Sequence, residues 1–318
     1  MAVFTEVPLE AARDLFEQLN VGKLQQLRGI AGGIENTNYF ATTDQGEYVL
    51  TLFERLSHEQ LPFYLYLMRH LAERGIAVPK PQANAAGEIL FTLCGKPAAV
   101  VDKLRGASQL QPQPTHCAKL GNLLARMHVA GQDFAMRQPN LRGLPWQNET
   151  APQVYPHLRA EQLDLLQEEL AYQNQIAASA AYAALPRGPV HADLFRDNVM
   201  FEGDTLTGCF DFYFAGVDTW IFDLGVCLND WAINHADGSH EPARAQALLD
   251  AYQAVRPFTA EERALLPDMT RAAALRFWVS RLWDFYLPRE ASMLTPHDPT
   301  HFERVLRQRK EHPLHVPA

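Results

Sequence analysis

The residues best suited to chemistry lie in one short stretch, VHADLFRDN, at positions 190–198. Asp193 and Asn198 lie within it, and Asp211 follows Asn198 after thirteen residues, between two phenylalanines. A carboxylate such as Asp193 can orient a hydroxyl group and accept its proton, whereas amide and carboxylate oxygens are hard ligands that suit Mg²⁺. This set predicts transfer of a phosphoryl group to an alcohol, with Asp193 as the base and Asn198 and Asp211 as metal ligands.

The order of these residues is as informative as their types. His-x-Asp-x4-Asn, an apolar strand, a turn and an apolar-Asp-apolar segment form the catalytic pattern of kinases. Each residue taken alone could equally belong to an ordinary surface loop. Together and in this order, between two apolar strands, they favour the kinase interpretation. We expect His191 to be structural and to hold the loop by a hydrogen bond.

The elements that must position this stretch begin with a β-rich segment. Apolar residues at helical spacing predict a helix over 9–19, and alternating patterns predict hairpins over 38–53 and 89–104. Ser57 with Gln60 resembles a capping box and predicts the start of a second helix. A small sheet accompanied by helices is therefore expected in the first third of the chain.

Beyond a linker at 105–114, rich in Pro and Gln, the chain reads as mostly helical. Helices are predicted over 160–181, from a capping box at Thr259, and from Pro267 onward. We expect an α+β fold with two lobes of the protein-kinase-like type. Residues 1–104 would form the nucleotide-binding lobe with its antiparallel sheet, and residues 105–318 the catalytic and substrate-binding lobe.

Composition narrows the class of protein further. The 318 residues suffice for two domains, and a net charge of −9 argues against binding to nucleic acid. No apolar run approaches the ~18 residues of a membrane span, and the N-terminus lacks a secretory signal pattern. The four cysteines have neither zinc-ligand nor Cys-x-x-Cys spacing. A cytoplasmic protein without a membrane or nucleic-acid partner is expected, and its oligomeric state stays open.

The chain resembles the small-molecule kinases of the aminoglycoside phosphotransferase and choline kinase type. That resemblance rests on the catalytic stretch and on the strings LGxxLAxMH at 120–128, GVD at 216–218 and FDLG at 222–225. Within that group it resembles the homoserine kinases, in the strings GIENTNY at 33–39, YVLTLFE at 48–54, NDW at 229–231 and RFWxSRL at 276–282. These strings are spread over nearly the whole chain.

The resemblance implies a function and a role for one further residue. It implies a phosphotransferase with an alcohol group as acceptor, which uses ATP and Mg²⁺ to convert L-homoserine into O-phospho-L-homoserine in threonine biosynthesis. It also implies that Asp223 braces the catalytic loop. A kinase of the same fold for an aminoglycoside, choline or a sugar is the alternative. A non-catalytic nucleotide-binding protein is a second alternative.

Phosphate binding is expected between the first two strands of the sheet. Backbone N–H groups at Gly32 and Gly33 can approach phosphates there, and Asn36 and Asn38 add neutral donors. Arg196, inside the catalytic stretch, is the best candidate for positive charge at the phosphates.

The third strand departs from the usual kinase pattern. Kinases carry a lysine there for the α- and β-phosphates, but this chain has Thr51. The missing lysine is the reason for considering a non-catalytic protein, and the intact Asp193, Asn198 and Asp211 argue against that idea. The adenine should bond to the backbone of the hinge, which we place at Val101, Asp102, Lys103 and Leu104.

A small amino-acid substrate needs an acceptor for its ammonium group and donors for its carboxylate. Asp230 is the candidate for the ammonium, and Arg276 or Arg281 for the carboxylate. Trp231 could form a wall of the pocket. Helix-surface ion pairing for the arginines and core packing for the tryptophan are the plain alternatives.

Overall fold

A computed structural model of the chain forms two compact units. It describes residues 5–30, 36–287 and 297–316. Unit 1 consists of Met1–Gly106 and Thr207–Tyr213, and unit 2 of Ala107–Leu206 and Phe214–Ala318. The α+β architecture predicted from the sequence is confirmed, and each unit is described by itself.

The structure corrects the predicted domain boundary at one segment. Thr207–Tyr213, which we had assigned to the second lobe, belongs to unit 1. The amide of Cys209 donates to the carbonyl of Ala77 at 3.0 Å, and the Tyr213 ring contacts Phe53 edge-on. These contacts are non-local, so the linear order of elements did not reveal them.

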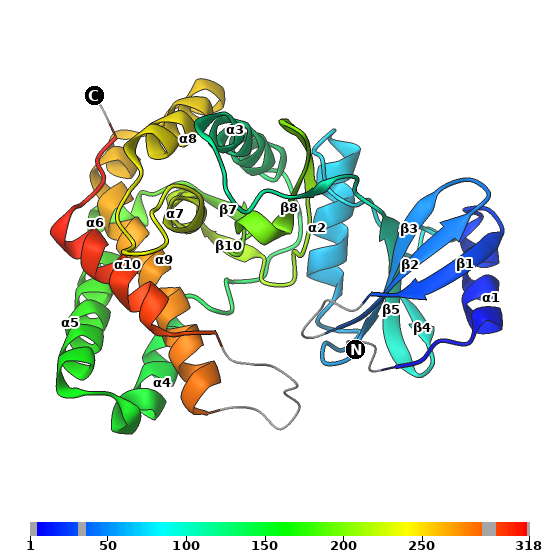
Figure 1. Cartoon of the computed structure of the whole chain (residues 1–318), viewed down its shortest axis with the longest axis horizontal. Helices are drawn as coiled ribbons and strands as arrows, with labels where there is room; N and C mark the ends of the chain where they lie inside the picture. The colour runs from blue at the N-terminus through cyan, green and yellow to red at the C-terminus, as the bar shows by residue number, and fades with distance from the viewer. Residues whose placement is uncertain (1–4, 31–35, 288–296, 317–318) are drawn as a thin grey trace. The chain divides into compact units, whose positions relative to one another are not determined.

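Unit 1 is built on a five-stranded antiparallel sheet in the order β1-β2-β3-β5-β4. Helix α1 (Leu9–Leu19) packs its apolar stripe against one face of this sheet (Figure 1). Alternation along β2 buries every second residue, as expected for a half-buried strand. The strands are β1 (Leu24–Gly29), β2 (Asn36–Thr43), β3 (Glu47–Phe53), β4 (Phe91–Leu93) and β5 (Lys96–Asp102).

Helix α2 (Pro62–Glu73) begins later than the predicted capping box. The Ser57 amide does donate to Gln60 Oε1 at 3.0 Å, but this bond closes a turn ahead of the helix. Pro62 occupies the first turn, where its missing N–H has no cost, and so it defines the start. Gly75, at φ +74°, follows the helix end in the left-handed conformation that glycine favours.

Unit 2 consists mainly of helices. They are α3 (Pro114–Ala130), α4 (Leu144–Val154), α5 (Ala160–Ala177), α6 (Ala180–Ala183), α7 (Trp220–Trp231), α8 (Pro242–Val255), α9 (Ala260–Tyr286) and α10 (Thr300–Glu311), with the 3₁₀ turns η1 (Tyr155–His157) and η2 (Arg196–Asn198). Its short strands are β6 (Ala107–Ser108), β7 (Arg187–Val190), β8 (Val199–Glu202) and β10 (Gly216–Thr219), whereas β9 (Thr205–Cys209) begins in unit 2 and continues into the segment that belongs to unit 1. β7 pairs with β10, and β6 pairs with β8.

Two predicted helix boundaries in unit 2 were wrong. The helix predicted over 160–181 ends at Ala177, and Ser179 then caps the short α6 by accepting from the Tyr182 amide at 3.1 Å. Helix α9 runs through Pro267 without a break. Both α9 and its Pro267 are packed in the core, so tertiary burial outweighs the local preference to end the helix. The capping box at Thr259 is confirmed.

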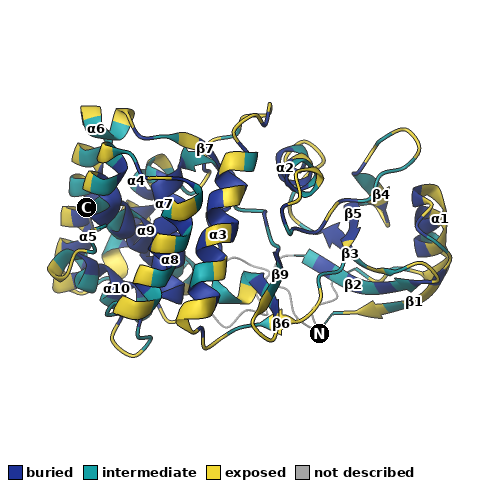
Figure 2. Ribbon diagram, turned by 90° about the horizontal axis from the view of Figure 1, so that it is seen from above, coloured by how far each residue is buried: buried dark blue, intermediate teal, exposed yellow. Residues whose placement is uncertain are grey.

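Helix α7 is the centre of unit 2, and all of its residues are buried (Figure 2). Gly225 permits close approach to α9, because a Cβ there would lie 2.9 Å from the Met269 carbonyl oxygen. Among its mostly apolar residues, α7 carries the buried polar side chains of Asp223, Asn229 and Asp230. Since buried polar groups require partners, these three residues point to functional or structural networks.

No helix in the described ranges combines the length and the apolar character needed to cross a membrane.

Candidate active site

The catalytic loop lies between β7 and β8. The side chain of Asp223 is hydrogen-bonded to the backbone of this loop. The fully buried carboxylate of Asp223 accepts the amide of His191 at 2.9 Å and that of Ala192 at 2.8 Å. Asp223 lies in the first turn of α7, the helix that forms the core of unit 2. Asp223 thus makes two hydrogen bonds to the backbone of the loop, and its role as a brace for catalysis stays a prediction.

Asp223 is itself oriented by His128 from helix α3. His128 Nε2 lies 3.1 Å from Asp223 Oδ2, and its Nδ1 lies 2.8 Å from the Tyr252 hydroxyl. Burial raises the pKa of Asp223, but the hydrogen bonds from His128 and from the His191 amide outweigh it and hold that pKa below its usual value. Burial lowers the pKa of His128, so the ring is neutral. Because an ionised carboxylate only accepts, Nε2 carries the proton and Nδ1 accepts from Tyr252.

The loop itself contains an uncommon backbone conformation. Ala192 has φ +63°, a left-handed value that costs a non-glycine residue free energy. Next to it, the Asp193 amide donates to His191 Nδ1 at 3.3 Å, which agrees with a structural role for this buried histidine. The Asn198 Nδ2 group donates to the Asp193 carbonyl oxygen at 2.8 Å. This bond fixes the Asn198 side chain and leaves its Oδ1 as the available ligand atom.

Aromatic packing anchors the other end of the loop. The Phe195 ring lies 4.5 Å from the Phe277 ring of α9 and 5.9 Å from the Phe302 ring of α10, measured between centroids. Sequence reasoning missed this role of Phe195, and it also missed His128 and Tyr252. The string that contains His128 was noted for its resemblance, but no local signal pairs it with residues about a hundred positions away.

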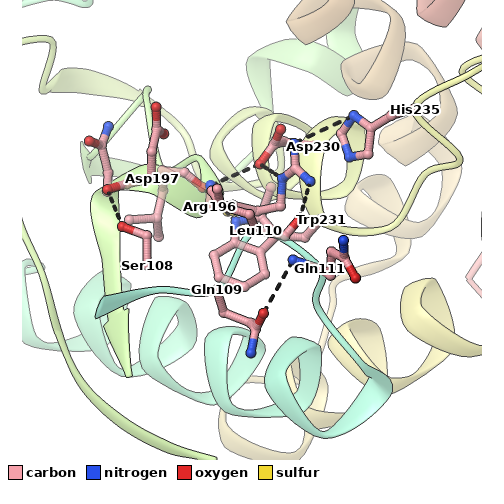
Figure 3. Close-up of polar contacts among 12 residues, drawn as sticks. Ser108, Gln109, Leu110, Gln111, Arg196, Asp197, Asp230, Trp231 and His235 are labelled. Carbon is pink, nitrogen blue, oxygen red and sulfur yellow. Dashed lines mark hydrogen bonds and ion pairs between the residues drawn. The ribbon is translucent and has the colours of Figure 1, made fainter. Parts of the chain in front are cut away.

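Arg196 forms a buried pair with Asp230 (Figure 3). Asp230 Oδ2 accepts the Arg196 amide at 2.8 Å and its Nε at 3.1 Å, while Arg196 Nη1 donates to the Leu110 carbonyl at 2.6 Å. Burial raises the pKa of Asp230, and the charge of Arg196 opposes that effect. The guanidinium is thus bonded within unit 2, and the predicted contact of Arg196 with phosphate stays a prediction.

A cavity of about 280 Å³ opens beside this pair. Its lining contains positive and negative groups in addition to aromatic and apolar surface. It is formed by Leu110, Phe195, Arg196, Asp197, Asp230, His235, Arg281, His297, His301 and Phe302. A small hollow with charges of both signs suits a small polar or zwitterionic ligand.

The remaining substrate candidates occupy different environments. Trp231 is fully buried, and its Nε1 donates to the Leu194 carbonyl at 3.0 Å, so it supports the catalytic loop from the core. It does not line the cavity described above. Arg276 is 2% exposed, and Asp193 exerts the strongest attraction on it of any neighbouring charge. Arg281 lines the cavity and is also attracted most strongly by Asp193.

Thr51 in unit 1 bonds to one of the predicted phosphate donors. Its hydroxyl donates to Asn38 Oδ1 at 2.7 Å, across the antiparallel pair of β2 and β3. This bond directs the Asn38 Nδ2 group away from Thr51, and Nδ2 lies 3.5 Å from the Asn36 carbonyl. The residue in the place of the usual lysine therefore orients a neutral donor. Gly32 and Gly33 lie outside the described residues.

The predicted hinge follows the end of β5. Val101 pairs with Val49, the Asp102 amide donates to the Lys80 carbonyl at 3.1 Å, and the Lys103 amide donates to the Glu47 carbonyl at 3.2 Å. Among the residues that the structure describes, the Leu104 amide has no such acceptor. If the adenine bonds to this segment, Leu104 is the amide that can donate to it.

Asp211 belongs to unit 1 and has φ +67°, a conformation that aspartate tolerates better than most residues. The other predicted metal ligand, Asn198, belongs to unit 2. In the described part of the chain, no group of three or more His, Cys, Asp or Glu side chains could hold a metal ion. Taken one by one, the amide oxygen of Asn198 and the carboxylate of Asp211 are hard oxygen donors of the kind that Mg²⁺ prefers.

Comparison with known proteins identifies the family. The model of the phosphotransferase enzyme family matches residues 26–265, so the chain belongs to that family. A solved amicoumacin kinase in complex with AMP-PNP, Ca²⁺ and Ami superposes with a TM-score of 0.67 at 18% identity, covering 94% of this chain and 91% of the other. The fold is thus the protein-kinase-like fold expected from the sequence, and membership of a kinase family implies the use of ATP.

The curated relatives are more specific. A homoserine kinase of Polaromonas naphthalenivorans (strain CJ2) is 64% identical over 313 residues, covering 98% of this chain and 99% of the relative. A homoserine kinase of Janthinobacterium sp. (strain Marseille) is 60% identical over 311 residues, covering 98% and 97% of the two chains. The resemblance stated from the sequence is confirmed.

Proposed function

We infer that this protein is an ATP-dependent homoserine kinase, which converts L-homoserine into O-phospho-L-homoserine on the route to threonine. The observation that carries this conclusion is the 64% identity to a homoserine kinase over nearly the whole of both chains. The braced catalytic loop supports catalysis rather than mere nucleotide binding, because Asp193 and Asn198 are present and Asp223 bonds to the backbone next to Asp193. The need for ATP is consistent with a cytoplasmic enzyme.

In the proposed mechanism Asp193 orients the side-chain hydroxyl of homoserine. As the hydroxyl oxygen attacks the γ-phosphorus of ATP, Asp193 accepts its proton and ADP leaves. The hydrogen bonds that Asp223 accepts from the loop keep the Asp193 carboxylate in place. The hydroxyl and its base are therefore already aligned when the substrate binds.

Asn198 and Asp211 would hold Mg²⁺. The bond from Asn198 Nδ2 to the Asp193 carbonyl presents the amide oxygen as a ligand, and Asp211 contributes the charge. When bound, Mg²⁺ neutralises charge on the phosphates and favours departure of ADP. Gly32, Gly33, Asn36, Asn38 and Arg196 remain the candidates for direct contact with the phosphates.

The charges around the cavity would bind the amino-acid part of the substrate. Asp230 Oδ2 is occupied by Arg196, which leaves Oδ1 to accept the ammonium group. Arg276 and Arg281 are the two candidates for the carboxylate, and of these Arg281 lines the cavity. Trp231 would act indirectly, because its bond to the Leu194 carbonyl holds the catalytic loop in place.

A coupled assay that detects ADP tests the function. L-Homoserine, choline, kanamycin and glucose are offered in turn at saturating MgATP, and the product is identified by ³¹P NMR. We expect turnover with homoserine alone, and Asp193→Asn should lower kcat by about 10²–10⁴-fold. Asp211→Ala should raise the Mg²⁺ concentration needed for half-maximal rate more than Asn198→Ala does, because it removes a charged ligand. Turnover of choline or kanamycin but not of homoserine would refute the assignment.

A further inference from the structure

Arg276 carries a buried charge whose hydrogen-bonding capacity is partly unused by the described residues. Its side chain is 2% exposed, and within the part of the chain that the structure describes, Nε and Nη2 have no hydrogen-bond partner. The guanidinium instead lies 3.9 Å from the centroid of the Phe277 ring and 5.1 Å from that of Phe214. A buried guanidinium with unmade hydrogen bonds is unfavourable for folding, so its presence calls for an anion that the free protein does not supply.

Other buried arginines of unit 2 make side-chain hydrogen bonds to protein acceptors. Arg309 is fully buried, and its Nε and Nη2 donate to Asn229 Oδ1 at 2.8 Å and to the Gly238 carbonyl at 2.9 Å, although its Nη1 has no partner among the described residues. Arg256 donates to Glu262 Oε1 at 2.7 Å. Arg276 differs from both, because neither its Nε nor its Nη2 has a partner in the described part of the chain.

The surroundings of Arg276 belong to the catalytic site. The Phe277 ring that its guanidinium contacts lies 4.5 Å, between centroids, from the Phe195 ring of the catalytic loop. The Asp193 carboxylate, two residues before Phe195, attracts the guanidinium, whereas Arg142 and Arg281 repel it. Arg281, from the same helix α9, lines the cavity that Asp197 also lines. An anion bound at Arg276 therefore lies near the base that meets the substrate hydroxyl, in a region with charges of both signs. Such a region suits a zwitterion better than a triphosphate.

We propose that Arg276 binds the carboxylate of the substrate and thereby selects a hydroxy amino acid over the amino alcohol that lacks the carboxylate. The proposal rests on the proposed function and adds to it the group that sets specificity. The planar guanidinium can donate two parallel hydrogen bonds to a carboxylate. A substrate without that carboxylate leaves the guanidinium unpaired, as it is in the free protein, and so gains none of this binding free energy.

The test compares L-homoserine with 3-aminopropan-1-ol, its analogue without the carboxylate, in the wild-type enzyme. We expect kcat/KM to be about 10²-fold or more higher for homoserine. This measurement needs no variant. Equal kcat/KM values for the two compounds would overturn the proposal while leaving the kinase assignment intact.

The variant Arg276→Met then tests whether Arg276 is the residue that causes the preference for homoserine over 3-aminopropan-1-ol. Its kcat/KM for homoserine should fall by about 10²-fold or more, whereas kcat/KM for 3-aminopropan-1-ol and KM for ATP should stay close to wild type. An equal fall with both substrates would mean that Arg276 serves the transferred phosphoryl group, and would overturn the proposal. Homoserine kinetics that stay like the wild type would also overturn it.

The melting temperatures of two variants distinguish an arginine that binds substrate from one that stabilises the fold. Arg276→Met replaces an unpaired buried charge by an apolar side chain, so its melting temperature should equal or exceed that of the wild type. The matched control Arg309→Met removes two made hydrogen bonds and should lower the melting temperature without changing the substrate ratio. A large loss of stability in Arg276→Met would show a structural role and contradict the proposal. If the wild type neither binds nor phosphorylates homoserine, the proposed function itself fails.

Discussion

Replacing Asp223 by asparagine tests whether the buried brace holds the catalytic loop in its reactive conformation. The carboxylate accepts the His191 and Ala192 amides through separate oxygens, at 2.9 and 2.8 Å. Asparagine is nearly isosteric but has a single acceptor oxygen, so one buried amide loses its partner. That loss should lower the free energy of unfolding by about 1–3 kcal/mol.

Activity should fall for a second reason, the strained backbone at Ala192. Its φ of +63° is less favourable than a right-handed conformation by roughly 1–2 kcal/mol. When the Asp223 bonds no longer offset this strain, the loop relaxes. Because about 1.4 kcal/mol corresponds to a factor of ten, only about a tenth of the molecules would keep Asp193 in position. We therefore expect kcat to fall about ten-fold or more, with KM for ATP nearly unchanged.

The assay is steady-state kinetics with saturating MgATP and homoserine, together with urea unfolding. Asp218→Asn is the matched control, because Asp218 is also a bonded carboxylate of unit 2, accepting from Asn140 Nδ2 at 2.8 Å, but does not bond to the loop amides. The control should lose stability and keep kcat. A wild-type kcat for Asp223→Asn, in a folded protein, would refute the argument that the brace maintains the loop.

Three further predictions concern the Thr51–Asn38 bond, the Arg196–Asp230 pair and the buried His240. Thr51→Val removes the 2.7 Å bond that orients Asn38, so KM for ATP should rise several-fold while the melting temperature changes little, and an unchanged KM would remove Asn38 from the phosphate site. Arg196→Ala removes the 3.1 Å bond and the positive charge beside Asp230, which keeps its bond from the backbone amide, so the free energy of unfolding should fall by about 1–3 kcal/mol, while a rise in KM for ATP would reveal the predicted phosphate contact as well. Burial and the charge of Arg309 lower the pKa of His240 to about 3, so below pH ~6.5 the unfolded chain binds a proton that the folded protein does not. Stability should therefore fall as pH drops from about 6.5, by at most about 1.4 kcal/mol per pH unit for this group, and urea unfolding of His240→Gln should show a shallower slope.

The chemistry of this protein could be predicted from the sequence because it is encoded locally. Asp193 and Asn198 lie in one loop, and their spacing alone indicates a base and a metal ligand for phosphoryl transfer. The β-rich first segment and the helical remainder follow from local apolar periodicity in the same way. Boundaries were predicted less well where tertiary contacts override local preference, as in helix α9, which continues through Pro267.

Only the tertiary structure shows which donor and acceptor side chains, distant in the sequence, are bonded to each other. Arg196 and Asp230 had been assigned to different ligands, yet they bond to each other although 34 residues separate them. His128 reaches Asp223 across 95 residues. Arg276 and Arg281 are equivalent in the sequence, but folding leaves Nε and Nη2 of the first without a partner among the described residues and places the second at a cavity. Residue types determine which bonds are possible, whereas packing determines which donors and acceptors meet and which charge stays unpaired until a substrate arrives.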